Sequence, residues 1–308
     1  MTDGTISTGS LRLDIALGIG GIPRGESIEI SGSISSGKTT ICQHIIAEAQ
    51  KMGETCGWID VDHSLDTDYV LRCGVNPELL YISEPESAEQ ALGILEILAG
   101  TGSMPVVVLD SVTSLISQGE LNSAFQESST ASIDSQLSQT LRRLYPLIHN
   151  NGTTILFTDQ VTTGISHVYH NLFQNPARLA LKLHAGIRLK LHSTHLLKRN
   201  GMTIGNHIEV RVIKNHFAPC LHRTEFDIMY DNGINKAGEI FDLGNQLRII
   251  VKQNSDYFFK DHKLGTKQSE ALIFLNQNLP IAEEIEQIIR LKMLSEISPA
   301  ATAYIQRP

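Results

Sequence analysis

The sequence predicts an α/β fold, with parallel strands around a phosphate-binding loop and a small separate domain at the C-terminal end. Three observations predict it. A strand-like segment runs directly into the glycine-rich stretch GSISSGKTT at Gly32–Thr40, and a helical pattern follows it. A second, apolar segment at Pro105–Ser111 ends next to an aspartate. After about Gly238 the alternation of strands and helices changes to a helical and mixed pattern.

The stretch Gly32–Thr40 matches the phosphate-binding pattern G-x-x-x-x-G-K-[ST]. Glycines let the backbone wrap closely around a phosphate and point successive N–H groups at it. Lys38 is expected to reach the β- and γ-phosphates, and the hydroxyl of Thr39 to ligate Mg²⁺. A chance glycine/serine turn is the weaker alternative, because a strand pattern at Ser27–Ile30 precedes the loop and a helical pattern at Thr40–Ala49 follows it.

Length and composition bound the class of protein. The chain has 308 residues, 41% hydrophobic and 19% charged, which is enough for a buried core. Its net charge of -8 argues against nucleic-acid binding by bulk charge, although it does not exclude a local basic track. The four cysteines form no C-x-x-C pair, so a reducing cytosol is the simplest setting. We find no signal peptide and no apolar run of ~18 residues, so we expect a cytoplasmic protein without a membrane partner.

Short elements are predicted ahead of the phosphate loop. Apolar side chains at Leu11, Leu13 and 15–17 favour a short helix, which the glycines after it end. The turn Pro23-Arg24-Gly25 then leads into the strand that carries the loop. Gly53 closes the helix that follows the loop.

A cluster of carboxylates follows the next predicted strand, at Cys56–Val61. It contains Asp60, Asp62 and Asp66. Because ligands of an open α/β sheet sit beyond the carboxyl ends of its strands, Asp62 is expected beside the phosphates. For Asp60 and Asp66, a structural role in loop solvation or helix capping is as good an interpretation as a role at the site.

The apolar run Pro105–Ser111 favours a buried parallel strand. Its carboxylate, Asp110, occupies the place where phosphate-loop enzymes hold Mg²⁺ directly or through water. A short strand over 79–83 and a helix over 87–98 are predicted between the two motifs.

Two polar stretches are predicted as loops. Residues 118–135 are serine-rich and lack a clear period, which is typical of a mobile loop, and residues 161–176 form a second loop. A helix over 137–148 and a strand over 153–158 are predicted between them.

Further strands are predicted at 187–191, 207–213 and 224–230, and the last two are expected to pair as neighbours. A helix over 281–293 should then bury one apolar face, made of Ile285, Ile288, Ile289 and Met293.

Together these motifs resemble the bacterial RecA recombinase family. The resembling stretches are Ile6–Leu11, Leu13–Gly18, Gly32–Thr40, Trp58–Asp60, Val106–Ser111, Asp159–Gln160, Asn175–Pro176, Val212–Asn215 and Gly233–Asn235. The similarity runs from about Ile6 into the 290s and so covers nearly the whole chain. It implies a RecA-type ATP-binding core at residues 1–235, with a twisted, mostly parallel sheet, helices on both faces of that sheet and two DNA-facing loops. Residues 236–308 would form the small C-terminal α/β domain.

The resemblance implies ATP and Mg²⁺ as cofactors. The residues expected to hold the phosphates are Gly32, Ser33, Ser35, Ser36, Gly37, Lys38, Thr39 and Thr40. Thr39 and Asp110 would serve Mg²⁺, with Lys38 as the phosphate lysine. Asp66 and Tyr69 match positions that hold and stack the adenine in the family.

Other matches imply how the nucleotide communicates with DNA and with a neighbouring subunit. Gln160 matches the glutamine that senses the γ-phosphate and moves the second DNA loop. Lys214 matches a lysine that reaches the nucleotide of the next subunit. The loops at about 123–130 and 161–175 match the two loops that contact single-stranded DNA. Ile165 matches an apolar residue that wedges between bases. The basic residues expected at the DNA are Arg142, Arg143 and Arg178.

The chain also departs from the family's pattern. Asp62 stands where the family has the glutamate that activates the attacking water, and its side chain is one methylene shorter. His216 replaces the second of two inter-subunit lysines. Thr162–Gly164 lack the family's basic residues in the second loop, so weaker binding of single-stranded DNA is expected. The N-terminal arm that builds the family's filament is short here, at residues 1–5, which weakens the expectation of an oligomer or filament.

The leading interpretation is a single-stranded-DNA-dependent ATPase of RecA type, acting in homologous recombination, DNA repair and the SOS response to DNA damage. The alternative is a degenerate RecA-like ATP-binding module with weak hydrolysis and no strand exchange. A small-molecule kinase is a third interpretation. It would need a lid with arginines, which the long middle loops lack.

Overall fold

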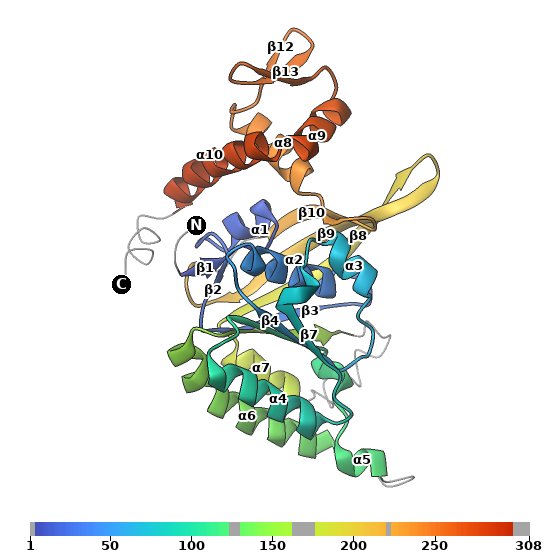
Figure 1. The fold of residues 1–308 in the computed structure, drawn as a ribbon, viewed down its shortest axis with the longest axis vertical. Helices are drawn as coiled ribbons and strands as arrows, with labels where there is room; N and C mark the ends of the chain where they lie inside the picture. Colours follow the sequence, from blue (N-terminus) through green and yellow to red (C-terminus); the bar gives the residue numbers. More distant parts are fainter. Residues whose placement is uncertain (1–3, 123–129, 162–175, 220–222, 298–308) are drawn as a thin grey trace.

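The computed structural model describes residues 4–122, 130–161, 176–219 and 223–297. A nine-stranded sheet forms its centre, in the order β11-β10-β9-β8-β3-β7-β6-β4-β5 (Figure 1). The strands are β3 Ser27–Gly32, β4 Cys56–Asp60, β5 Leu80–Ser83, β6 Val106–Asp110, β7 Thr154–Gln160, β8 Ile187–Arg199, β9 Met202–Asn215, β10 Arg223–Met229 and β11 Gly233–Ile234. From β8 to β5 neighbouring strands are parallel, and from β8 to β11 they are antiparallel. The predicted α/β architecture is confirmed, including the pairing of β9 with β10.

Helices cover both faces of this sheet (Figure 1). One face is covered by α1 Leu11–Ala16, α2 Lys38–Gln50 and α3 Thr67–Arg72. The other is covered by α4 Ala88–Thr101, α6 Thr130–Asn151 and α7 Pro176–His184. A small ladder, β1 Thr5–Ile6 with β2 Ile22–Pro23, precedes β3.

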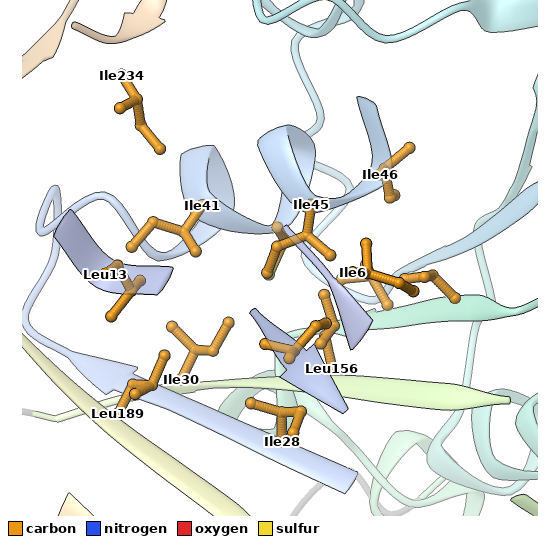
Figure 2. Packing of buried hydrophobic residues seen from close by; sticks show 14 of the residues in the cluster. Ile6, Leu13, Ile28, Ile30, Ile41, Ile45, Ile46, Leu156, Leu189 and Ile234 are labelled. Atoms are coloured by element: carbon orange, nitrogen blue, oxygen red, sulfur yellow. The ribbon is translucent and has the colours of Figure 1, made fainter. Parts of the chain in front are cut away.

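The alternation of side chains along a strand decides which helices each residue meets. On β7, Leu156 joins the cluster that contains Ile41 and Ile45 of α2, and all three are fully buried (Figure 2). Its neighbours Ile155 and Phe157 point to the opposite face and pack with the cluster of α4, α6 and α7. Both faces of the central strands are therefore hydrophobic, as expected for a parallel sheet with helices on both sides.

The prediction of a mobile loop over residues 118–135 is wrong at both ends. The structure has a short helix, α5 Gln118–Asn122, and α6 begins at Thr130. Residues 123–129 lie outside the described part of the chain. Ile133 and Leu137 are buried in the same cluster, so tertiary packing extends the helix over a stretch whose serines and glutamines obscure its period.

The strands β8 and β9 extend beyond the predicted segments into a long projecting hairpin (Figure 1). Asn200 and Gly201 form its tip with φ of +53° and +82°, the left-handed backbone that an Asn-Gly turn favours. The outer half of the hairpin is largely exposed and mixes polar with apolar residues, so it shows no continuous hydrophobic alternation.

The C-terminal elements have a hydrophobic cluster of their own. They are α8 Lys236–Gln246, β12 Val251–Gln253, β13 Asp256–Phe259, β14 His262–Gly265, α9 Gln268–Gln277 and α10 Leu279–Ile297. The predicted helix over 281–293 lies within α10. The four residues predicted along its apolar face all belong to this cluster: Ile285, Ile288, Ile289 and Met293. The cluster also includes Leu11 and Ile15 of α1, so the C-terminal elements pack against the start of the core.

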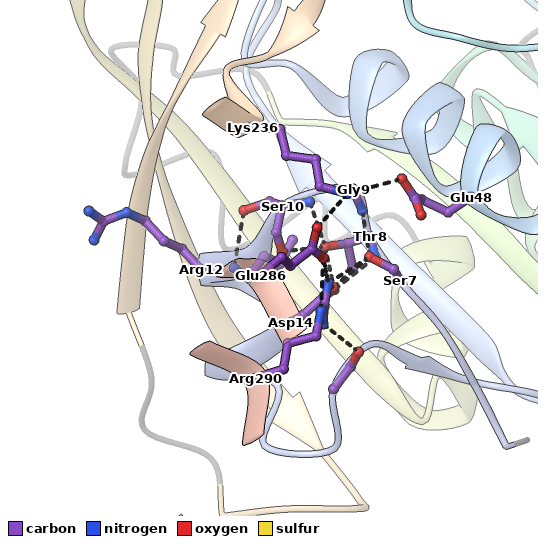
Figure 3. Close-up of polar contacts among 12 residues, drawn as sticks. Ser7, Thr8, Gly9, Ser10, Arg12, Asp14, Glu48, Lys236, Glu286 and Arg290 are labelled. Carbon is purple, nitrogen blue, oxygen red and sulfur yellow. Dashed lines mark hydrogen bonds and ion pairs between the residues drawn. The ribbon is translucent and has the colours of Figure 1, made fainter. Parts of the chain in front are cut away.

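A buried carboxylate joins α1 to α10 (Figure 3). Asp14 is fully buried, and the guanidinium of Arg290 lies 2.7 Å from its Oδ2. The hydroxyls of Ser7 and Thr8 and the backbone N–H of Thr8 donate to the same carboxylate at 2.6–2.8 Å. Every polar bond that a buried carboxylate needs is thus supplied by two segments far apart in the sequence.

A second ion-pair chain reaches the helix that follows the phosphate loop. Lys236 of α8 contacts Glu286 of α10 at 2.9 Å and Glu48 in the last part of α2 at 3.7 Å (Figure 3). Glu286 also pairs with Arg290 at 2.8 Å. The C-terminal helices are therefore tied by charge to both α1 and α2.

Replacing Arg290 by methionine should lower the free energy of unfolding by about 3–5 kcal/mol, because it leaves the carboxylate of Asp14 buried without its cation. Urea unfolding followed by circular dichroism measures the change. The control is Lys260→Met, which breaks an ion pair with Glu284 whose side chains are 57% and 46% exposed. That control should change stability by less than about 1 kcal/mol. Equal effects of the two substitutions would contradict the assignment.

Candidate functional site

The phosphate loop lies at the carboxyl end of β3, between the parallel neighbours β7 and β8. Gly37 has φ of +90°, and a Cβ atom there would lie 2.5 Å from Cδ1 of Ile228. A Cβ on Gly32 would lie 2.8 Å from the carbonyl oxygen of Leu191 and would clash with the hydroxyl of Ser36. Both glycines of the motif are therefore required by the close approach of the loop to its neighbours.

The polar groups of the loop suit a phosphate. The helix α2 begins at Lys38 without a side-chain cap, so its N-terminal N–H groups and dipole face the loop. The hydroxyl of Ser36 is buried and has no hydrogen-bond partner among the described residues. Lys38 Nζ donates to the carbonyl of Ser33 at 2.9 Å. Burial lowers the pKa of the Lys38 ammonium, although Asp110 opposes this shift, and a phosphate would supply the counter-charge.

Asp110 and Thr39 are in direct contact. The hydroxyl of Thr39 donates to Oδ2 of Asp110 at 2.8 Å, and the hydroxyl of Thr158 donates to Oδ1. Asp110 is 5% exposed, and burial raises the pKa of its carboxyl group against the effect of these two donors. A carboxylate and a hydroxyl beside a phosphate loop are the hard oxygen ligands that Mg²⁺ takes together with phosphates and water. The residues present therefore fit the expected ion.

Asp62 lies next to this pair, in the turn after β4. Its carboxylate is exposed and accepts a hydrogen bond from the hydroxyl of Ser111 at 3.2 Å. Its backbone N–H points at the carbonyl of Asp110 at 3.4 Å. Asp60, in contrast, is 2% exposed and accepts from the N–H of Leu65 at 3.0 Å, which shapes the turn. The structure thus separates a carboxylate that faces solvent beside the loop from one that is buried.

Asp66 and Tyr69 lie at the start of α3, against the phosphate-loop helix. Asp66 is the N-cap of α3, and its carboxylate accepts a hydrogen bond from the backbone N–H of Tyr69 at 3.1 Å. This is the helix-capping role considered for Asp66 from the sequence. The hydroxyl of Tyr69 lies 3.4 Å from Oγ1 of Thr40 on α2. Burial raises the pKa of Tyr69 to about 12. Arg72 stacks over its ring at 5.6 Å.

Gln160 ends β7 directly beside the phosphate loop. Its register partner on β3 is Gly32, and the next residue, Val161, donates its N–H to the carbonyl of Gly32 at 2.9 Å. The backbone N–H of Gln160 donates to the hydroxyl of Thr113 at 2.8 Å. The structure therefore brings Gln160, Thr39 and Asp110 to the same edge of the sheet.

Lys214 lies toward the other end of the strands, away from the phosphate loop. It pairs across β8 and β9 with Arg188, whose register partner on β3 is Glu29, near the start of that strand. Its Nζ donates to the carbonyls of Lys182 and Leu183 at 3.2 and 2.9 Å and so caps the end of α7. The structure does not bring Lys214 to the phosphate loop of its own chain.

The structure places the residues predicted to contact DNA in different surroundings. Arg142 is exposed on α6 and lines a cleft of about 290 Å³ together with His184 and His216. Arg143 points to the neighbouring helix, where it pairs with Glu96 of α4 at 2.6 Å. Adjacent residues of a helix face different directions, so the two arginines do not act as one patch. Ile165 lies outside the described residues, and the side chain of Arg178 is likewise not described.

Three hydroxyl residues of the site were missed by sequence reasoning: Ser111, Thr113 and Thr158. Each bonds a predicted site residue, but the contacts join different strands and depend on their register. The available signal was position, because all three lie within three residues of the carboxyl end of β6 or β7.

Within the described ranges, no helix has the length and apolar character needed to cross a bilayer. The same ranges contain no group of three or more histidine, cysteine or acidic side chains placed so that it could hold a metal ion.

Comparison with known proteins identifies one family over nearly the whole chain. The model of the RecA N-terminal domain matches residues 2–235, and that of the RecA C-terminal domain matches residues 238–294. Protein RecA of Campylobacter hominis is 43% identical over 293 residues, which are 95% of this chain and 84% of that protein. Protein RecA of Caldanaerobacter subterraneus is 42% identical over 285 residues, 92% of this chain and 83% of that protein.

A third relative, Protein RecA of Chloroflexus aurantiacus, is 40% identical over 290 residues, 94% of this chain and 83% of that protein. The phosphate loop, the contact between Thr39 and Asp110, and the nine-stranded sheet all lie inside the region that the N-terminal model matches. The chain belongs to the RecA family of recombination and repair ATPases.

Proposed function

We propose that this chain binds ATP with Mg²⁺ at Gly32–Thr40 and hydrolyses it in response to single-stranded DNA, in homologous recombination and repair. The contact between Thr39 and Asp110 carries the proposal, because it places both expected Mg²⁺ ligands at the end of the phosphate loop. Membership of the RecA family supports the use of ATP on DNA.

Each predicted residue has a proposed task. The loop N–H groups and Lys38 bind the phosphates, and Thr39 and Asp110 hold Mg²⁺, which when bound neutralises charge on the β- and γ-phosphates. Asp62 accepts the proton of the attacking water, and Gln160 senses the γ-phosphate. Asp66 and Tyr69 hold the adenine, on the side of α2 where Tyr69 already contacts Thr40.

For DNA binding, the proposal follows the sequence. The loops at 123–130 and 161–175, with Ile165, would contact single-stranded DNA, together with Arg142 and Arg178. Arg143 is a weaker candidate because Glu96 already neutralises it. Lys214 would meet the nucleotide of a neighbouring copy, since it lies toward the other end of the strands, away from its own loop.

Several broader assignments also remain proposals. We divide the chain into the ATP-binding core at 1–235 and the small C-terminal domain at 236–308. Self-association into an oligomer or filament and a cytoplasmic location follow the predictions from the sequence. The degenerate ATP-binding module gains no support from the comparisons, which match proteins named RecA along the full core.

ATP turnover should rise when single-stranded DNA is added to the full chain, and a slowly hydrolysed ATP analogue should give filaments visible by electron microscopy. Phosphate release measures turnover. Lys38→Ala is the control, and it should reduce turnover to background because it removes the ammonium that meets the phosphates. Turnover indifferent to DNA, with only small oligomers, would refute the proposed function. A wild-type rate for Lys38→Ala would refute the site itself.

Asp62→Glu should raise the rate of DNA-stimulated turnover by about tenfold or more, because the added methylene extends the carboxylate toward the attacking water. The matched control is Asp68→Glu, the same change at an exposed carboxylate on α3, which should leave the rate unchanged. If Asp62→Glu is no faster than wild type, the site is tuned for aspartate and another group places the water.

A further inference from the structure

A short 3₁₀ helix, η2 Val112–Ser114, follows Asp110 and Ser111 directly. Thr113, in its middle, is exposed, yet its hydroxyl makes two hydrogen bonds to the end of β7. It donates to Oδ1 of Asp159 at 2.9 Å and accepts from the backbone N–H of Gln160 at 2.8 Å. A hydroxyl has one proton and two lone pairs, so both bonds are made at the same time.

The same turn also contacts the candidate catalytic carboxylate. The hydroxyl of Ser111 donates to Asp62 at 3.2 Å and lies 3.1 Å from the hydroxyl of Ser114. One short segment therefore touches Asp62 through Ser111 and touches Gln160 through Thr113. Any shift of η2 changes the surroundings of both residues together.

The turn is also close in sequence to the contact between Thr39 and Asp110. Asp110 lies three residues before Thr113, and its carboxylate is bonded to Thr39 in this structure. Thr39 and Asp110 would hold Mg²⁺ through the same oxygens that now bond each other, and η2 continues directly from this strand end.

The carboxylate that Thr113 bonds is itself buried. Asp159 is 3% exposed, and the hydroxyl of Thr113 supplies a hydrogen bond to one of its oxygens.

We propose that Thr113 is a positioning residue, whose hydroxyl connects the turn after Asp110 to Asp159 and Gln160 at the end of β7. It touches no substrate. It acts on turnover through Gln160, and so it builds on the ATPase function proposed above.

Thr113→Val tests the role, because valine keeps the shape of the side chain and removes the hydroxyl. Thr113→Ser keeps the hydroxyl and should restore every measured property. The matched control is Thr153→Val, just before the other end of β7, where the buried hydroxyl has no hydrogen-bond partner among the described residues. All four proteins are compared as full chains.

Hydrogen exchange of the Gln160 amide is the first measurement. It should become about tenfold faster in Thr113→Val, since that amide loses its acceptor, and stay unchanged in Thr113→Ser and Thr153→Val. The second is ATP turnover with single-stranded DNA. In Thr113→Val kcat should fall about tenfold, through loss of geometry at Gln160, while the Kd for ATP stays within about twofold.

Unchanged exchange at Gln160 in Thr113→Val would overturn the proposal. Normal DNA-stimulated turnover despite fast exchange would also overturn it, and so would loss of ATP binding or of thermal stability, because either loss marks a purely structural role. If wild type itself shows no DNA stimulation, the proposed function fails instead. Thr113 is then supported only if an ATP analogue with Mg²⁺ alters Gln160 exchange in wild type but not in Thr113→Val, and is overturned otherwise.

Discussion

The buried carboxylate of Asp110 is bonded by hydroxyls from two other elements, Thr39 at the start of α2 and Thr158 on β7. A buried carboxylate is stable only when its oxygens are bonded, so this contact fixes the ends of β6 and β7 against the phosphate-loop helix. The strand order β3-β7-β6 makes it geometrically available, because the three carboxyl ends lie at one edge. The candidate nucleotide site therefore depends on the sheet, and a phosphate loop on an isolated strand would lack the carboxylate that we propose as a Mg²⁺ ligand.

The helix α2 connects this site to the rest of the molecule. Its first residue, Lys38, faces the loop, and Glu48 near its end meets Lys236 of the C-terminal elements. The chain of ion pairs continues through Glu286 and Arg290 to the buried Asp14 of α1 (Figure 3). A helix held at both ends gives the loop a rigid support, as preorganised binding requires. The C-terminal elements thus stabilise the site without contacting it.

Features formed by residues close together in the sequence are predicted best. The phosphate loop, its strand and helix, and the apolar strand ending in Asp110 are continuous motifs, and each was recognised where the structure has it. Contacts across strands were not predictable in this way. Thr158 and Thr113 bond Asp110 and Gln160 only because β6 and β7 are in a particular register. Residues 130–135 read as a loop because the burial of Ile133, which favours a helix there, depends on tertiary packing. The structure places Asp62 in contact with Ser111 and Gln160 beside Gly32, whereas their roles stay predictions.

With Gln160 as the proposed sensor of the γ-phosphate, a nucleotide at Gly32–Thr40 should control the binding of single-stranded DNA. The most direct measurement is the affinity of the full chain for a fluorescent oligo(dT) at one fixed salt concentration, with Mg²⁺ and either a slowly hydrolysed ATP analogue or ADP. Allosteric coupling of ordinary strength predicts binding about tenfold tighter or more with the analogue. Equal affinities with the two nucleotides, in a protein that binds both, would contradict the account.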